Sequence, residues 1–158
     1  MRECPTHIRN GRYPFNRFIV PEQIPHHVIE EIRAQYPEHP FNAALNYIHQ
    51  KIRYVQDDSR WQRPDYWQFS AQTLRLGTGD CEDTSFLLAS ILLAMGIKED
   101  DVCVVIGRWH GGGHAWVEVL SDSKCYILES TSGGLHECNE KRILGYEGDL
   151  KVYWWGCK

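Results

Sequence analysis

The segment from Gly77 to Ile97 constrains the fold more than any other part of the sequence. A glycine-rich turn leads into it, and between Phe86 and Ile97 only Ser90 and Gly96 are not apolar. A helix that is apolar on all sides is buried inside a protein, and this run is too short to span a bilayer. We therefore predict a buried helix that starts near Cys81 and is ended by Gly96.

Acidic residues surround Cys81 at the predicted start of this helix. Asp80 holds the N-cap position and Asp83 lies three residues later, which is the spacing of a capping box. The dipole at a helix start favours a thiolate by roughly 0.3–1 kcal/mol, too little to outweigh the neighbouring carboxylates, Glu82 included. A reactive Cys81 therefore needs a cationic partner such as histidine. Otherwise it is simply a small residue at a helix start.

Length, charge and cysteine content limit the class of protein. The chain has 158 residues, a net charge of −4 and no strongly basic block, so neither nucleic acid nor a membrane is expected as a partner. We predict a single domain over residues 1–158 that acts as a monomer. The start of the sequence has no apolar signal segment, which favours a cytoplasmic protein. There, the six cysteines would be free thiols, with Cys103 and Cys125 filling the core.

The first half of the chain reads as mainly helical. An irregular arm over residues 1–25 is expected to wrap the core, followed by a short amphipathic helix over 26–36. Apolar residues at spacings of three and four predict a second helix, capped by Asn42 and ending near Gln56. The prediction continues with a polar loop over 57–65 and a short helix over 71–76 capped by Ser70.

The second half reads as mainly strand. The predicted elements are, in order, a buried strand over 102–106, a flexible loop over 108–113, a hairpin of 114–120 with 125–131, a loop over 132–145 with a short helix near Lys141, and a last strand over 150–155. Helices followed by an antiparallel sheet make an α+β fold.

The register of the predicted hairpin brings a histidine and a carboxylate together. If Leu120 pairs with Cys125, then His114 and Glu129 lie on the same face as diagonal neighbours, with Cα atoms about 7–8 Å apart. A carboxylate there would orient the imidazole and stabilise its protonated form. This arrangement activates a thiol as a thiolate–imidazolium pair.

Three separated motifs carry a resemblance to a known family. The residues GDCED at 79–83, GHAWVEV at 113–119 and LEST at 128–131 resemble the Cys, His and acid motifs of the transglutaminase-like superfamily, in the same order. Trp67 is similar to a tryptophan upstream of the Cys in bacterial members. The resemblance covers residues 41–131 and implies a papain-like fold, in which the Cys helix packs on an antiparallel sheet.

The resemblance also implies roles for individual residues. Cys81 would be the nucleophile, His114 the general base and acid, and Glu129 the residue that orients the imidazole. Glu129 departs from the family, which usually has Asp followed by Pro and Thr. The oxyanion would be bound by the Cys81 N–H and a side-chain donor, for which the candidates are Trp67 first and then Gln68 and Gln72, with Trp116 and His110 as further cleft residues.

Metal sites compete for some of these residues. His110 and His114 are four apart, but the three glycines between them exclude a helical metal pair. His136 and Cys138 could join Cys4 and Cys157 around zinc, although no C-x-x-C spacing is present and scattered thiols are the simpler interpretation. Calcium could bind Asp80, Glu82 and Asp83, as in some bacterial relatives, but helix capping explains these residues more simply. We therefore expect neither a metal nor a cofactor.

The sequence thus predicts a thiol hydrolase that cleaves peptide or amide bonds through a thioester. Transglutaminase-type acyl transfer to an amine is the second hypothesis, and a non-catalytic module that binds peptides is the third. Hydrolysis is favoured by analogy, because the chain lacks the extra domains of dedicated cross-linking enzymes. The expected partner is a peptide or protein substrate.

Overall fold

The computed structural model describes residues 3–9, 11–35, 39–56 and 66–158. The first half contains β1 (Thr6–Arg9), β2 (Gly11–Pro14), the 3-10 helices η1 (Phe15–Phe18) and η2 (Pro21–Gln23), α1 (His26–Gln35), α2 (Pro40–Lys51), β3 (Arg53–Tyr54), α4 (Ser70–Leu76), β4 (Thr78–Gly79) and α5 (Cys81–Ala94). The second half contains η3 (Glu99–Asp101), β5 (Val102–Trp109), β6 (Gly112–Ser121), β7 (Lys124–Glu129), β8 (Gly134–Glu137), η4 (Cys138–Glu140), α6 (Lys141–Leu144), β9 (Tyr146–Tyr153) and β10 (Gly156–Cys157).

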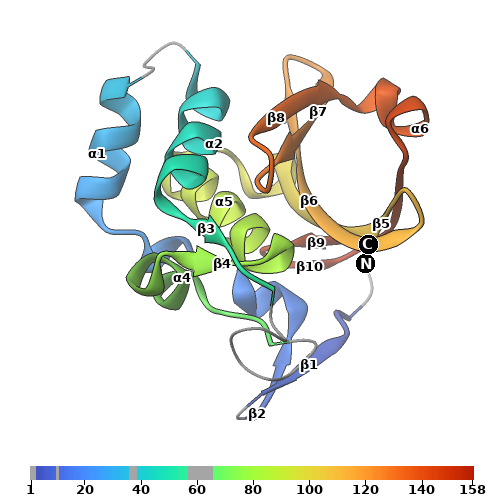
Figure 1. The fold of residues 1–158 in the computed structure, drawn as a ribbon, viewed down its shortest axis with the longest axis horizontal. Helices are drawn as coiled ribbons and strands as arrows, with labels where there is room; N and C mark the ends of the chain where they lie inside the picture. The colour runs from blue at the N-terminus through green and yellow to red at the C-terminus, as the bar shows by residue number, and fades with distance from the viewer. Residues whose placement is uncertain (1–2, 10, 36–38, 57–65) are drawn as a thin grey trace.

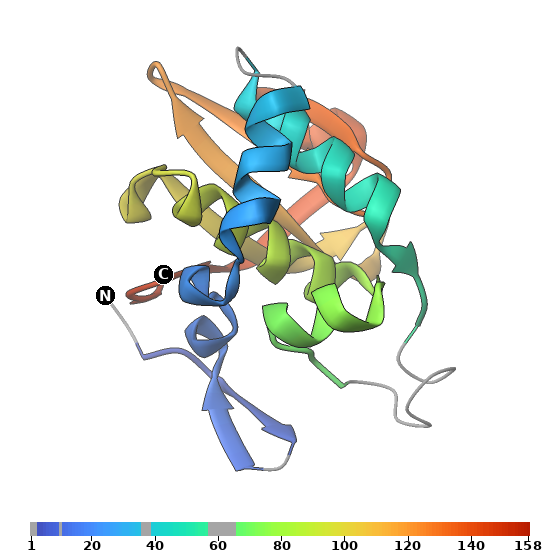
Figure 2. The same ribbon diagram turned by 90° about the vertical axis from the view of Figure 1, so that its left-hand side faces the viewer.

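Helix α5 is the centre of the molecule, as predicted from its apolar sequence. Asp80 caps it and forms the predicted capping box with Asp83. Every residue from Phe86 to Leu92 is fully shielded from solvent. Gly96 follows the helix with φ +101, a conformation that glycine adopts at little cost. In Figure 2, α1, α2 and α5 form a layer in front of the sheet.

Six antiparallel strands form the sheet, in the order β10-β9-β5-β6-β7-β8. The sheet is strongly curved, with α1, α2 and α5 on one side and α6 on the other (Figure 1). Val117 and Val119 of β6 belong to the core shared with α5, whereas Trp116 belongs to a second cluster that includes Tyr146. The predicted α+β class is therefore confirmed, and its sheet has an apolar cluster on each face.

The predicted hairpin register is present. Leu120 pairs with Cys125, and the pairing continues to Val117 with Leu128. The loop predicted at 108–113 is wrong, because β5 and β6 pair as far as Trp109 with Gly112. Only His110 (φ 50) and Gly111 (φ 81) remain as the turn, and two positive φ values in a two-residue loop suit the twist of a hairpin.

The N-terminal arm predicted to be irregular is ordered. Strands β1 and β2 pair as a hairpin, and two 3-10 helices follow. Phe18 and Ile19 are buried in the core shared with α5. Burial of these two side chains helps to order residues 3–9 and 11–25, which their aperiodic sequence did not predict.

Several predicted boundaries shift. The helix expected from Asn42 begins instead at Pro40, because proline suits the first helical position. It ends at Lys51, because the residues that follow form β3, which pairs in parallel with β4. Ser70 is the first residue of α4, and its hydroxyl donates to Ser90 rather than capping the helix. The loop predicted over 57–65 lies outside the described residues.

The segment 132–145 is more ordered than predicted. Strand β8 pairs with β7 along its length. Residues Gly134 to Glu137 therefore add a strand to the sheet beyond the predicted hairpin. The short helix expected near Lys141 is present as α6. The last strand begins earlier than expected, at Tyr146, and pairs with β5.

Four of the six cysteines form disulfides, which contradicts the prediction of free thiols. Cys4 is bonded to Cys157, joining the two ends of the chain, and Cys125 is bonded to Cys138. The remaining two, Cys81 and Cys103, are free. The prediction failed because sequence separation does not reveal which thiols the fold brings together. In the described part of the chain, no helix is both long and apolar enough to cross a membrane.

Candidate active site

Cys81 lies at the N-terminus of α5 with 8% of its surface exposed. Its Sγ donates a hydrogen bond to Oε2 of Glu82 at 3.3 Å. The backbone N–H of Ala115, in the middle strand β6, also donates to the sulfur. Helix α5 therefore places the thiol next to the peptide bond between His114 and Ala115.

Strand β6 has an unpaired edge next to this thiol. It pairs with β5 as far as Gly112, but its pairing with β7 starts only at Val117. Among the described strands, Ala115 is therefore paired only with β5, and its N–H is free to meet the sulfur of Cys81. In the described residues, no hydrogen bond joins this sulfur to His114, whose ring lies beside Trp109 and Trp116.

His114 and Glu129 form the contact that the hairpin register predicted. The imidazole Nε2 lies 2.7 Å from Oε2 of Glu129, and both side chains are largely buried. The phenol of Tyr146 donates to the same oxygen at 2.9 Å, and the N–H of Thr131 donates to Oε1 at 3.3 Å. These donors hold the side chain of Glu129, which is one methylene longer than the usual aspartate. Because Glu129 contacts Nε2, the other ring nitrogen of His114, Nδ1, is not bound by this glutamate.

The environment of Cys81 favours a neutral thiol. Burial is the largest effect that raises its pKa, and the charges of Glu82 and Asp80 raise it further. The Ala115 N–H lowers the pKa but does not compensate. The sequence correctly predicted that the acidic flank raises the pKa of this thiol. The resting structure, however, does not contain the predicted thiolate–imidazolium pair.

We expect Glu82→Gln to accelerate alkylation of Cys81 by iodoacetamide at pH 7. The substitution removes the nearest negative charge and so lowers the thiol pKa, and a change of about one pKa unit raises the thiolate population about tenfold. Mass spectrometry of the labelled peptide over time would measure the rate. Glu99→Gln, at an exposed site in η3, is the control, and an unchanged rate in Glu82→Gln would show that Glu82 does not restrain the thiol.

Two of the predicted oxyanion donors also have structural contacts. The side-chain amide of Gln68 donates to the carbonyl of Thr78 at 2.9 Å and to Oδ2 of Asp83 at 3.1 Å, so it holds the turn that leads into α5. The indole of Trp67 is buried and stacked on His7. The role of both residues as oxyanion donors stays a prediction.

The remaining cleft candidates occupy different places. Trp116 is fully buried, and its indole N–H donates to Glu118 at 3.2 Å, so it cannot line an open cleft. His110 is exposed in the β5–β6 turn, and its ring contacts Trp109. Gln72 is half-buried on α4, and its role stays a prediction.

Two tyrosines near the site were missed from the sequence. Burial is the largest effect that raises the pKa of Tyr54. Tyr54 pairs with Gly79, two residues before Cys81, and has 46% of its surface exposed. Tyr146 contacts Glu129, as described above. Neither residue belongs to a recognisable motif; the only available signal for Tyr54 was its place at the end of the predicted second helix.

The acidic residues that flank Cys81 cap the helix. Oδ1 of Asp83 accepts the Gln68 N–H, and Oδ2 accepts the Gln68 amide and the Asp80 N–H. Oδ1 of Asp80 accepts the Asp83 N–H. These bonds form the capping role predicted for Asp80 and Asp83. Cys4, Cys138 and Cys157, considered above for zinc, are all in disulfides.

Solved structures share this fold. LapG of Legionella pneumophila, in its EGTA-treated form, matches with a TM-score of 0.66 and 17% identity over 80% of this chain and 68% of LapG. Its calcium-bound form matches with the same score and identity over 80% and 70%. A candidate cysteine protease from Cytophaga hutchinsonii matches with a TM-score of 0.55 and 16% identity over 78% of this chain and 44% of that protein. These likenesses confirm the papain-like, transglutaminase-like fold.

Sequence comparison identifies the family. No curated protein matches the chain significantly. The family model of the CEP76 peptidase-like domain matches residues 65–147, which include Cys81, His114 and Glu129. The matched region is more than half of the chain. The chain therefore belongs to the CEP76 peptidase-like domain family, within the transglutaminase-like superfamily.

Proposed function

We propose that this protein is a thiol hydrolase that cleaves peptide or amide bonds with Cys81, His114 and Glu129. The observation that carries the proposal is the 2.7 Å contact between His114 and Glu129, next to the peptide whose N–H holds the Cys81 sulfur. A nucleophile, a base and a residue that orients the base are the three parts of such a site. The peptidase-like fold of the family supports the same reaction class.

The reaction begins from a neutral thiol. As Sγ attacks the carbonyl carbon of the substrate, its proton passes to the imidazole of His114, whose orientation Glu129 fixes. The tetrahedral intermediate collapses, the carbon–nitrogen bond breaks, and the imidazolium gives its proton to the leaving amine. Water, activated by His114, then attacks the thioester and releases the acid and the free thiol.

The oxyanion requires two hydrogen-bond donors. The backbone N–H of Cys81 is the first in this proposal. Tyr54 joins Trp67, Gln68 and Gln72 as a candidate for the second, because it pairs with Gly79, two residues before Cys81, and its phenol is partly exposed. Burial and the nearby negative charges raise the pKa of this phenol, so it keeps its proton and remains a donor.

Acyl transfer to a primary amine remains the second hypothesis, since it uses the same thioester. Calcium has no step in the proposal, because the oxygens of Asp80 and Asp83 described above already cap α5. The monomeric state and the cytoplasmic location stay predictions, and the two disulfides are typical of proteins from oxidising compartments.

Turnover of a peptide library tests the proposed reaction. The full chain and its Cys81→Ala variant would be incubated with the library, with and without a primary amine, and the products identified by mass spectrometry. Cleavage by the wild type alone supports hydrolysis, whereas amine adducts identify acyl transfer. Binding of peptides without turnover, equal in both proteins, would contradict the proposal and favour a non-catalytic module.

A further inference from the structure

The orientation of Glu129 depends on a residue distant in the sequence. The phenol of Tyr146 donates to Oε2 of Glu129 at 2.9 Å, the same oxygen that lies 2.7 Å from His114. The ring of Tyr146 packs against Trp116 with centroids 4.9 Å apart. Burial and the Glu129 charge raise the pKa of the phenol, so it stays protonated and acts as a donor.

Tyr146 is placed by the segment that precedes it, residues 134–145, here called the strap. The strap consists of β8, η4 and α6. Its last residues are held by the β5–β6 turn: the Trp109 indole donates to the carbonyl of Leu144 at 3.1 Å, and the His110 N–H donates to the carbonyl of Gly145 at 2.9 Å. The position of Tyr146 is therefore set by how the strap is anchored.

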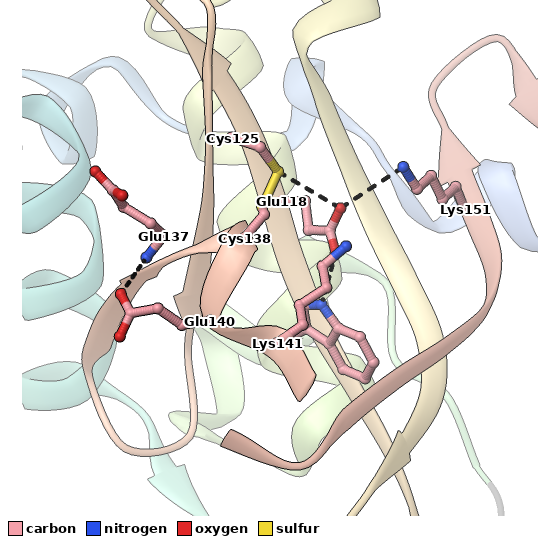
Figure 3. Close-up of a disulfide and its surroundings, with 8 residues drawn as sticks. Glu118, Cys125, Glu137, Cys138, Glu140, Lys141 and Lys151 are labelled. Carbon is pink, nitrogen blue, oxygen red and sulfur yellow. Dashed lines mark hydrogen bonds and ion pairs between the residues drawn. A yellow bond between two sulfur atoms is a disulfide. The ribbon is translucent and has the colours of Figure 1, made fainter. Parts of the chain in front are cut away.

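Two further anchors hold the middle of the strap (Figure 3). The disulfide joins Cys138, at the start of η4, to Cys125 on β7. Lys141 of α6 forms an ion pair with the buried Glu118 of β6. Because Glu118 has only 4% of its side chain exposed, this pair is better shielded from water than a surface ion pair. Both anchors fix α6 next to the strand that carries His114.

We propose that Tyr146 is a positioning residue for the Cys-His-Glu site, and that the Cys125–Cys138 disulfide keeps it in place through the strap. This inference rests on the proposed function and adds to it. Tyr146 fixes one rotamer of the long Glu129 side chain, and Glu129 in turn fixes the imidazole. The site therefore works fully only when the strap is bonded to β7.

A double-mutant cycle tests the role of Tyr146. The rate of Cys81 alkylation by iodoacetamide would be measured at pH 7 in the full chain. Tyr146→Phe removes only the hydroxyl and is expected to lower the rate about tenfold, a part of the roughly 100-fold or larger contribution of the base that it helps to position. In the Glu129→Gln background the same substitution should have no further effect, because Tyr146 acts through Glu129. Equal effects in both backgrounds would show a general structural role and overturn the proposal.

Matched variants test the strap. Tyr153→Phe, on the same strand β9 but distant from Glu129, should leave the rate unchanged. Cys125→Ser with Cys138→Ser should lower the rate as Tyr146→Phe does, whereas Cys4→Ser with Cys157→Ser should lower only the melting temperature. An unchanged rate without the Cys125–Cys138 disulfide would overturn the role of the strap. If that double variant does not fold, the double-mutant cycle of Tyr146 and Glu129 decides the proposal.

The same measurements separate this inference from the proposed function. If His114→Ala reacts as fast as the wild type, then the proposed function fails and this inference falls with it. If His114→Ala is slow but Tyr146→Phe reacts like the wild type, then the proposed function stands and only the inference is wrong.

Discussion

His114→Ala is expected to slow the reaction of Cys81 with iodoacetamide at pH 7 by about 100-fold or more, the usual contribution of a general base. In the wild type, the proton of the thiol passes to the imidazole as the sulfur–carbon bond forms. In the variant, only the rare thiolate reacts. Burial and the charges of Glu82 and Asp80 raise the pKa of this thiol, which makes the thiolate rarer still.

His110→Ala is the matched control, since this exposed histidine lies in the turn before His114 and its ring contacts Trp109. Labelling would be followed peptide by peptide. Cys103 is the internal reference, because it is also a free thiol and burial raises its pKa to about 12. A His114→Ala variant that remains folded and reacts like the wild type would remove the case for His114 as the base.

The pH dependence of the His114→Ala variant follows from the same pKa shift. Below the pKa of a thiol, each pH unit raises the thiolate fraction tenfold, and the raised pKa of Cys81 extends this region upward. The alkylation rate should therefore rise about tenfold per unit from pH 7 to pH 9 without levelling off. A plateau within this range would mean that the thiol ionises near neutrality without His114.

The parts of the site that were predictable lie on regular elements with a clear pattern. Alternation in β6 and β7 fixed the hairpin register, and that register alone placed His114 next to Glu129. The capping spacing of Asp80 and Asp83 correctly placed Cys81 at the start of α5. In both cases a short-range rule determines the geometry, so no knowledge of the tertiary fold was needed.

The parts that were missed depend on contacts between distant segments. Tyr146 reaches Glu129 only because α6 folds back against β6, and Tyr54 approaches Cys81 only because β3 pairs with β4. Both disulfides likewise depend on tertiary folding, including the one between Cys4 and Cys157 at opposite ends of the chain. The burial of Trp67 and its stacking on His7 likewise depend on the tertiary fold.

Asp83→Ala is expected to be the most destabilising substitution near the site. Asp83 has 1% of its surface exposed. It accepts hydrogen bonds from the Gln68 N–H at 2.7 Å, the Gln68 amide at 3.1 Å and the Asp80 N–H at 3.2 Å. Alanine would leave the two backbone donors without their acceptor inside the core, while the Gln68 amide would keep its bond to the Thr78 carbonyl. A buried donor without a partner costs about 1–3 kcal/mol, so we expect the free energy of unfolding to fall by about 3–5 kcal/mol.

Urea unfolding followed by tryptophan fluorescence would measure this loss, with Glu99→Ala as the exposed acidic control. Asp83→Asn keeps one acceptor oxygen and should lose less stability than Asp83→Ala. This order follows only if the carboxylate acts as a hub for buried donors. If calcium binding were instead its main role, then Asp83→Ala would leave the stability of the metal-free protein almost unchanged. A loss below about 1 kcal/mol, the contribution of a single ordinary hydrogen bond, would therefore contradict the capping role and make calcium the better explanation of the acidic cluster.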